Sequence, residues 1–426
     1  FYDILKGEDN LQFNGQAPFF GFADIFPSGP GSGPSGLQDP YASAGAVNPF
    51  PSKPPSQNLN FNAAGYIPFG GGGVYFVDPN LRTPYVYQYN LSIEQQLASN
   101  MLLELGYLGY SAHKLTGLID INPMILGTNT RLYNLDPNNP NYSYLDEFQN
   151  IGKANYNAAE VKLRRNASMG AWGSSFFTLG YTWSHEIDNS SGFRERNSVV
   201  PFYNHNEFRA SGDTDVRQIL TFSGGWELPF NQLWERGPKL LTSGWSLYPI
   251  LTVRTGFPLD VFAGLNTTRS DPGPSGAGDA GNVHADLVGN QVTTIDPKNF
   301  QSLTNPTAGT TTAGNYYFNP ANFSISRLLA LDALAKNDAS TLPYYTYGSF
   351  PRNGLRGPGQ TNLDLAITKH FRVRERLDVE LRGDEFNVFN HTEFQNPDTI
   401  VTDSTFGQIS NTYPGRILQL ALHLQF

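Results

Sequence analysis

The amino-acid sequence predicts an all-β protein, an antiparallel transmembrane β-barrel with long extracellular loops, of which the chain holds about nine strands. Three observations favour this fold class. Apolar and polar residues alternate with a period of two in segment after segment, and short connections between segments alternate with long ones. Most segments are about 10 to 13 residues long, close to the roughly 9 to 11 that a tilted strand needs to cross a bilayer.

The composition excludes several other classes of protein. The 426 residues include 43 glycines and 30 prolines, and only 15% are charged, which excludes a coiled coil or helical bundle. The net charge of −9 disfavours a nucleic-acid binder, and 13% aromatic residues disfavour a disordered acidic tail. Because there is no cysteine, disulfides, thiolate metal sites and cysteine nucleophiles are excluded as well.

Residues 1–84 are predicted to be a loop or linker region. Residues 27–55 are rich in Gly, Pro, Ser and Ala, and four consecutive glycines follow at 70–73. The chain starts at Phe1, without an initiator Met or a signal peptide, so we expect a processed or partial chain. Residues 85–426 are expected to form the C-terminal part of a barrel.

The first predicted hairpin joins strands at 85–97 and 101–111 through residues 98–100. One face of its strands is apolar, and carries Tyr85, Tyr87, Tyr89, Leu91, Ile93, Met101, Leu103, Leu105 and Tyr107. The second hairpin joins 156–165 to 171–187, with an apolar face made of Ala159, Val161, Leu163, Phe177, Leu179, Tyr181 and Trp183. The third joins 215–228 to 243–255, with Leu220, Phe222, Trp226, Leu228, Trp245, Leu247, Leu251 and Val253.

Three more strands are predicted at 361–371, 376–389 and 417–426. The first two carry Leu363, Leu365, Ile367, Leu377, Val379 and Leu381 on one face. The last strand places four leucines in phase with a terminal aromatic residue, namely Leu418, Leu420, Leu422, Leu424 and Phe426. This pattern resembles the signal read by the outer-membrane barrel assembly machinery, so we expect these residues to direct assembly. The alternative is an ordinary edge strand that ends in Phe.

The connections divide into two groups. The short ones are 98–100, 166–170, 229–242 and 372–375, and the long ones are 112–155, 188–214, 256–360 and 390–416. In a transmembrane β-barrel the tight turns lie in the periplasm and the long loops outside the cell. We expect the outward-facing Arg165 and Lys369 to reach lipid head groups, and the membrane interfaces to carry Tyr85, Tyr181, Trp183, Trp226 and Trp245.

Several segments resemble the TonB-dependent outer-membrane receptors, in particular the Oar-like β-barrel proteins. They are DPNLRTPYV at 78–86, DINP at 120–123, YTWS at 181–184, NGLRGPG at 353–359, EFNVFNH at 385–391 and RILQLAL at 416–422. The resemblance implies a 22-stranded barrel closed by an N-terminal plug, with about thirteen strands upstream of this chain. It also implies the TonB system as a partner, although no plug or TonB-contacting segment is recognisable here.

No catalytic, cofactor-binding or metal-binding motif stands out, and an enzyme is the least supported class. Asp271, Asp279 and Asp286 could offer calcium oxygen ligands but lack EF-hand spacing. Tyrosines crowd the long loops, where flat rings with a polar tip suit stacking on a ligand. These candidate ligand-binding residues are Tyr133, Tyr142, Tyr144, Tyr316, Tyr317, Tyr344 and Tyr345. The alternative is packing of the loops on themselves.

The sequence therefore predicts an outer-membrane receptor or transporter, which captures a small solute, oligosaccharide or peptide with its loops and passes it through a plugged lumen. Its expected surroundings are outer-membrane lipid, and no nucleic-acid partner is expected. A non-transporting surface barrel, such as an adhesin or export component, is the second hypothesis. A soluble carbohydrate-binding β-sandwich or propeller is the third, and solubility without detergent would favour it.

Overall fold

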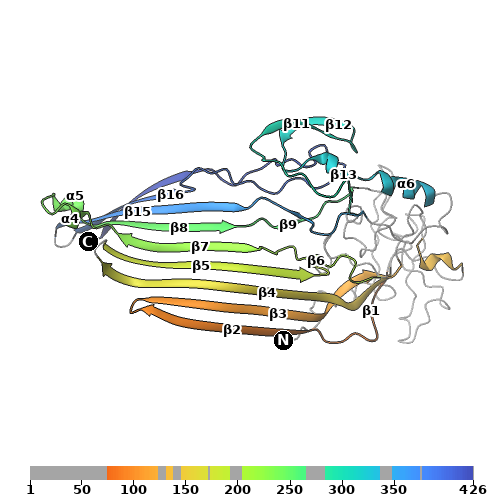
Figure 1. Ribbon diagram of the computed structural model, residues 1–426, viewed down its shortest axis with the longest axis horizontal. Helices are drawn as coiled ribbons and strands as arrows, with labels where there is room; N and C mark the ends of the chain where they lie inside the picture. Colours follow the sequence, from red (N-terminus) through yellow and green to blue (C-terminus); the bar gives the residue numbers. More distant parts are fainter. Residues whose placement is uncertain are drawn as a thin grey trace, which may run out of the picture.

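One antiparallel sheet dominates the protein (Figure 1). The computed structural model describes residues 74–122, 131–137, 145–170, 173–191, 204–264, 284–335, 348–374 and 377–425. The long strands of the sheet follow the order β2-β3-β4-β5-β7-β8-β15-β16-β17, so each pairs with the next long strand along the chain. In the described part of the chain, no helix is both long and apolar enough to cross a membrane.

All nine predicted strands are confirmed. They are β2 Tyr85–Ala98, β3 Met101–Asp120, β4 Leu145–Gly170, β5 Gly173–Asp188, β7 Gln218–Glu227, β8 Trp245–Arg254, β15 Gln360–Arg374, β16 Leu377–Phe386 and β17 Ile417–Gln425. Two short strands join the sheet at the long-loop end. β1 (Val74–Val77) runs parallel to the start of β4, and β6 (Ala210–Ser211) pairs with the end of β5. β1 therefore gives structure to part of the predicted linker 1–84, whose first 73 residues lie outside the described residues.

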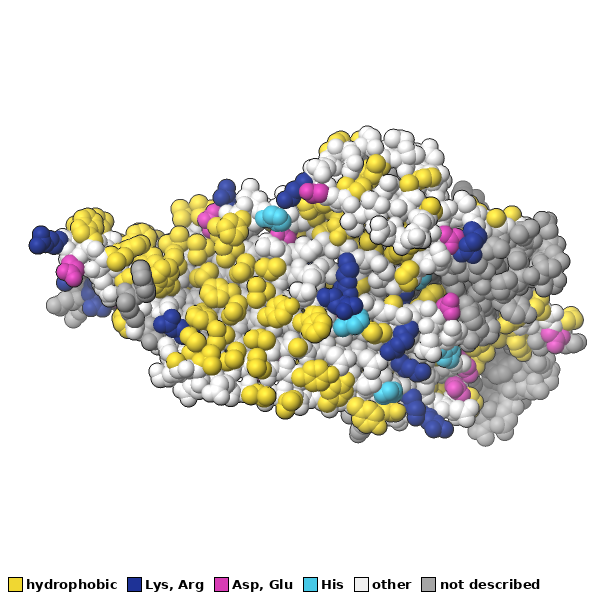
Figure 2. All heavy atoms as spheres, in the orientation of Figure 1, with side chains coloured by type: hydrophobic (Ala, Val, Ile, Leu, Met, Phe, Trp, Pro, Cys, Tyr) yellow, Lys and Arg dark blue, Asp and Glu magenta, His cyan; other side chains and the backbone are white. Residues whose placement is uncertain are grey.

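The register keeps apolar side chains on one face of the sheet. One row of directly paired residues crosses six strands and is apolar throughout: Ile93, Leu105, Val161, Tyr181, Leu220 and Val253. The adjacent row lies on the opposite face and reads Glu94, Glu104, Lys162, Gly180, Thr221 and Thr252. Figure 2 shows hydrophobic side chains gathered over the strands. Since a slip of one residue would exchange the two faces, burial of one face in lipid fixes the register.

Strands β3 and β4 are much longer than the sequence predicts. The expected connection 112–155 is partly wrong, because β3 continues to Asp120 and β4 already begins at Leu145. These extensions carry polar residues on both faces and contain register shifts near Leu115, and several of their residues are buried by protein, with Phe148 0% and Ile119 1% exposed. As a result β3, β4 and β5 reach further toward the long-loop end than β7, β8 and β15 (Figure 1).

The predicted short connections lie at the opposite end. Only Ser99 and Asn100 separate β2 from β3. The connection between β7 and β8 is longer and holds two short helices, α4 (Phe230–Leu233) and α5 (Lys239–Thr242).

The two long loops that follow β8 and β16 fold together into what we call the loop unit, residues 255–264, 284–335, 348–359 and 387–416. Its elements are β9 Pro258–Leu259, β10 Asp286–Leu287, β11 Phe300–Asn305, β12 Thr310–Asn315, η5 Pro320–Asn322, β13 Phe323–Ser324, α6 Ser326–Ala335 and β14 Leu355–Arg356. β9 pairs with β14, β10 with β13 and β11 with β12. One further short helix, η2 (Tyr133–Leu135), lies between β3 and β4.

Candidate functional site: the rim at the long-loop end of the sheet

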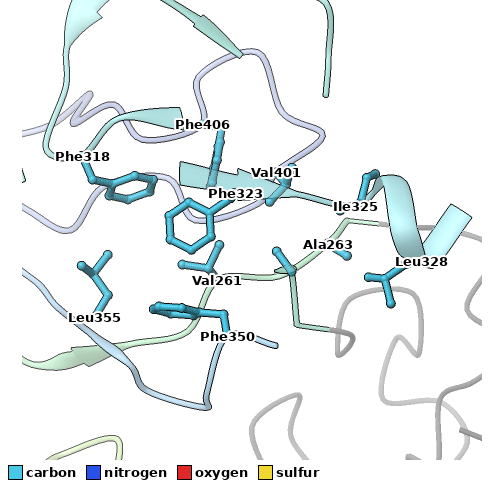
Figure 3. Close-up of a cluster of buried hydrophobic side chains, with 11 residues drawn as sticks. Val261, Ala263, Phe318, Phe323, Ile325, Leu328, Phe350, Leu355, Val401 and Phe406 are labelled. Atoms are coloured by element: carbon cyan, nitrogen blue, oxygen red, sulfur yellow. The ribbon is translucent and has the colours of Figure 1, made fainter. Parts of the chain in front are cut away.

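The loop unit has a hydrophobic core of its own (Figure 3). The rings of Phe318, Phe323 and Phe406 pack edge to face, with centroids 5.1 to 5.7 Å apart. The loops after β8 and β16 are also joined through the backbone, since the Val401 N–H donates to the Phe262 carbonyl at 2.9 Å. The long loops after β8 and β16 therefore pack into one structure of their own beside the ends of the strands.

A buried arginine fastens the loop unit to the end of β5. Arg352 is only 4% exposed, and its guanidinium lies 2.6 Å from Asp188 and 3.0 Å from Asp213. It also donates to the Ser191 hydroxyl at 2.5 Å and to the Phe208 carbonyl at 3.3 Å. Because Asp188 is the last residue of β5, this arginine clamp joins the loop unit to the longer strands of the sheet.

The next residues extend the clamp. Asn353 adopts a positive φ of 53°, which Asn tolerates better than most residues, and its side chain donates to Asp213 at 2.8 Å. Arg356 pairs with Asp215, which also receives the Glu186 N–H at 2.8 Å. Burial alone would raise the pKa of Asp215, but these hydrogen bonds and the Arg356 charge outweigh it and lower that pKa. Asp215 is therefore a firmly ionised anchor.

A second buried carboxyl group, Asp260, behaves differently. It accepts the Asn353 N–H at 2.5 Å and lies 3.5 Å from the His284 ring nitrogen Nε2. Burial raises the pKa of Asp260 to about 6, although the Asn353 hydrogen bond and the Arg352 charge act in the opposite direction. Burial, assisted by the Arg352 charge, lowers the pKa of His284 to about 4. Both groups therefore favour their neutral forms at mildly acidic pH.

Other segments that carry the family resemblance also form fixed contacts at this rim. The Asn150 side chain accepts the Arg82 N–H at 2.6 Å and donates to the Lys114 carbonyl at 2.8 Å. Asp120 pairs with Arg131 at 2.5 Å. The segments DPNLRTPYV, DINP and NGLRGPG thus share a structural role, which is to hold the loops and strand ends together.

A cavity of about 220 Å³ lies where β8 and β15 meet the loop unit. Its lining combines one guanidinium, three aromatic rings and three amides: Arg254, Phe257, Phe394, Tyr413, Gln360, Gln395 and Asn396, with Pro358 and Gly359. Arg254 donates to the Gln360 side chain at 2.9 Å and lies 4.5 Å from the centroid of the Phe257 ring. Such a lining can hold a ligand that offers hydroxyl or carboxylate oxygens to the polar groups and a flat face to the rings.

The predicted ligand-binding tyrosines occupy different environments. Tyr133 is 39% exposed in the loop between β3 and β4. Tyr316 is 1% exposed, and its hydroxyl bonds to Thr312 and Gln408 at 2.7 and 2.9 Å, so in this conformation it packs loops together. Tyr317 packs against the loop-unit core, and burial raises its pKa. The remaining four lie outside the described residues: Tyr142, Tyr144, Tyr344 and Tyr345.

Apart from the segment NGLRGPG, which was noted only for its family resemblance, the residues of the cavity and the clamp were not singled out from the sequence. Arg254 and Tyr413 lie far apart in the chain, and Arg352 meets Asp188 only in the folded rim. The sequence does contain one signal for the clamp, which is the pair of arginines Arg352 and Arg356 in a predicted loop. A loop Arg in a weakly charged chain often has a fixed acidic partner.

The predicted membrane residues follow the expected face with one difference. Leu418, Leu420, Leu422 and Leu424 are 50 to 78% exposed on the apolar side of β17, and Phe426 lies outside the described residues. Lys369 does not extend toward head groups, because its amine donates to the Ser243 carbonyl and lies 5.3 Å from the centroid of the Trp245 ring. The side chain is therefore only 7% exposed.

Of the three acidic residues considered for calcium, Asp286 is the one that lies within the described residues. Asp286 receives two hydrogen bonds from Arg327, at 2.6 and 2.9 Å, whereas Asp271 and Asp279 lie outside the described residues. Among the described residues, no group of three or more His, Asp or Glu side chains could hold a metal ion.

Comparison with solved structures finds bacterial outer-membrane proteins. The outer membrane transporter YddB from Escherichia coli is 13% identical, with 84% of this chain and 34% of that chain covered, at a TM-score of 0.40. The ferripyoverdine receptor of Pseudomonas aeruginosa is 11% identical (80% and 27% covered, TM-score 0.36). The ferric enterobactin receptor of the same organism is 13% identical (82% and 32% covered, TM-score 0.36). The chain thus spans about a third or less of each.

Among curated proteins, the comparison finds no matching relative. A family model, described as the outer membrane beta barrel domain, matches residues 1–419. This match covers nearly the whole chain and agrees with the antiparallel sheet whose apolar face is exposed. It also sets aside the soluble β-sandwich hypothesis. The chain belongs to the outer membrane beta barrel domain family, and its place is the outer membrane.

Proposed function

We propose that the chain is the C-terminal part of the barrel of a TonB-dependent receptor of the Oar-like group, whose loops capture a solute for passage through the lumen. The observation that carries this proposal is the loop unit, packed around its own hydrophobic core, beside a cavity lined by Arg254, Phe257 and Tyr413. A rigid site loses little conformational entropy when a ligand binds. The lining suits an oligosaccharide, a peptide or another solute rich in oxygen atoms, and exposed loop tyrosines such as Tyr133 would add stacking surfaces.

Two partners belong to the same proposal. The TonB system would act on a plug inside the barrel. The barrel assembly machinery would read the final strand, in which Leu418, Leu420, Leu422 and Leu424 alternate with polar residues up to Phe426.

Uptake by whole cells tests the proposal. Labelled oligosaccharides, oligopeptides and ferric chelates are offered to cells with and without the protein, each with and without a functional TonB system. We expect one class to accumulate only when both are present, and the cavity variants Arg254→Ala and Tyr413→Ala to reduce that accumulation. Phe300→Ala, at an exposed site in β11, is the matched control. Equal accumulation without TonB would rule out energy coupling.

A non-transporting surface barrel is the second candidate. The hairpin β11–β12 favours it, because six residue pairs hold this threonine-rich hairpin, and it projects from the loop unit (Figure 1). Surface binding of a ligand or host cell without uptake, lost when residues 300–315 are replaced by a short Gly-Ser linker, would support this candidate against transport.

A further inference from the structure

The connection between β7 and β8, residues 228–244, differs from its neighbours at the same end of the sheet. The β2–β3 turn consists of two residues, whereas this connection folds into α4 and α5. A hairpin needs only two to five loop residues. The connection is therefore longer than is needed to reverse the direction of the chain, which suggests that its additional residues have another role.

Large apolar side chains of this connection are exposed instead of packed into a core. They are Phe230 (42% exposed), Leu233 (69%), Trp234 (58%), Leu240 (60%) and Leu241 (63%). Two basic residues, Arg236 and Lys239, lie among them and are exposed. Apolar and aromatic side chains beside Lys and Arg are typical of helices that lie in a membrane interface.

The contacts of α5 place it at the apolar, lipid-facing side of the sheet. Trp245, the first residue of β8, pairs with Lys369 in the register, on the same face as the apolar rows. Its indole N–H donates to the Leu241 carbonyl at 2.8 Å, and the Lys369 amine donates to the Ser243 carbonyl. The end of α5 is thus fixed to the outer face of the sheet rather than to its polar face.

The exposed patch also continues the lipid-facing surface. Trp226, near the end of β7, is 40% exposed on the apolar face, and Figure 2 shows hydrophobic side chains extending from the strands to the α4–α5 end. Since lipid covers this face of the strands, the same membrane continues over the adjoining patch.

We propose that residues 228–244 form an interfacial anchor that inserts its apolar side chains into the periplasmic leaflet of the outer membrane. The partner is the phospholipid surface itself. The side chains of Phe230, Leu233, Trp234, Leu240 and Leu241 enter the acyl region, and Arg236 and Lys239 extend to the phosphate groups. This inference depends only on the barrel lying in a membrane, and holds whether or not the protein transports a solute.

Tryptophan fluorescence in vesicles tests the anchor. The intact protein and its Trp234→Phe variant are reconstituted into phosphatidylglycerol-containing vesicles, and the difference between their emissions gives the Trp234 signal while Trp245 keeps its bond to Leu241. Lipids brominated on their acyl chains should quench this signal, and aqueous iodide should not. The Trp226→Phe variant, treated in the same way, gives the lipid-exposed control. The Phe300→Trp variant, whose added tryptophan lies on the β11–β12 hairpin, gives the water-exposed control.

We expect brominated lipid to reduce the Trp234 emission about as much as that of Trp226, and the double variant Leu240→Ser with Leu241→Ser to shift quenching from bromine to iodide. Retained heat-resistant migration on gels would show that this variant still folds. Trp234 emission that responds like the Phe300→Trp control would overturn the proposal. Protection from both quenchers would also overturn it, because it would indicate a protein partner or a second copy instead of lipid.

Discussion

Removing the arginine clamp with Arg352→Ala should release the loop unit from the end of β5 while leaving the barrel folded. The change leaves Asp188, itself 3% exposed, without the partner that lies 2.6 Å away. Breaking a buried ion pair by removing one partner costs about 3–5 kcal/mol. Because 1.4 kcal/mol corresponds to a factor of ten, the open population of the loop unit should rise between about 100-fold and a few thousand-fold.

Hydrogen–deuterium exchange on the protein in vesicles measures this opening. The reporting amides are those of Gly348, Phe350 and Asn353, which donate to His284, Ala285 and Asp260. The matched control is Arg327→Ala, since that arginine has a side chain 46% exposed in its pair with Asp286 and should cost about 1 kcal/mol or less. If Arg352→Ala changes the protection of these amides no more than the control does, the clamp does not hold the loop unit.

Four other outcomes follow from the structure. The raised pKa of Asp260 makes the loop unit gain stability as pH falls from about 6 to 4, and the lowered pKa of His284 makes it lose stability from about 6.5 to 4. Hydrogen–deuterium exchange of the loop-unit amides, corrected for intrinsic rates, should therefore vary little with pH in the wild type. The exchange should slow toward acid pH in His284→Gln and quicken toward acid pH in Asp260→Asn. If the three proteins show the same dependence of exchange on pH, this expectation is wrong. Phe318→Ala should destabilise the loop unit by about 3–5 kcal/mol and expose it to external protease, while the strands stay resistant. Leu420→Arg, near the middle of the lipid-facing side of β17, should cost about 2–4 kcal/mol in urea unfolding from vesicles, whereas Gln419→Arg on the opposite face should cost little. Deleting Phe426 should lower the amount of folded protein in the outer membrane, and unchanged amounts would refute its role in assembly.

The strands could be predicted from the sequence because lipid imposes a simple rule on them. A side chain such as Leu105 or Val161 must face lipid, and its neighbours Glu104 and Lys162 must not, so the period of two appears in the sequence itself. The rule ends where the strands leave the membrane. Beyond that point residues of β3 and β4 such as Ile119 and Phe148 are buried by neighbouring protein instead of facing lipid, and the regular alternation that would have revealed the extensions disappears.

The candidate site could not be predicted for a different reason. The loop-unit core joins Val261, Phe318, Phe350 and Val401, which are far apart in the chain and follow no period. The clamp likewise depends on which strand ends become neighbours. The segment NGLRGPG drew attention only by resemblance, and its role became clear when its asparagine and its arginine were found against Asp213 and Asp215.

The clamp to β5 also determines how the loop unit withstands force. A bulky ligand or particle that is held by the unit and pulled away from the cell loads the strands along their length. In that direction the hydrogen bonds between strands act in shear, so many must fail together. Because Arg352 joins the unit to Asp188, the load is shared by β5 as well as by β8 and β15. The clamp therefore spreads a pull on the loop unit over one more strand.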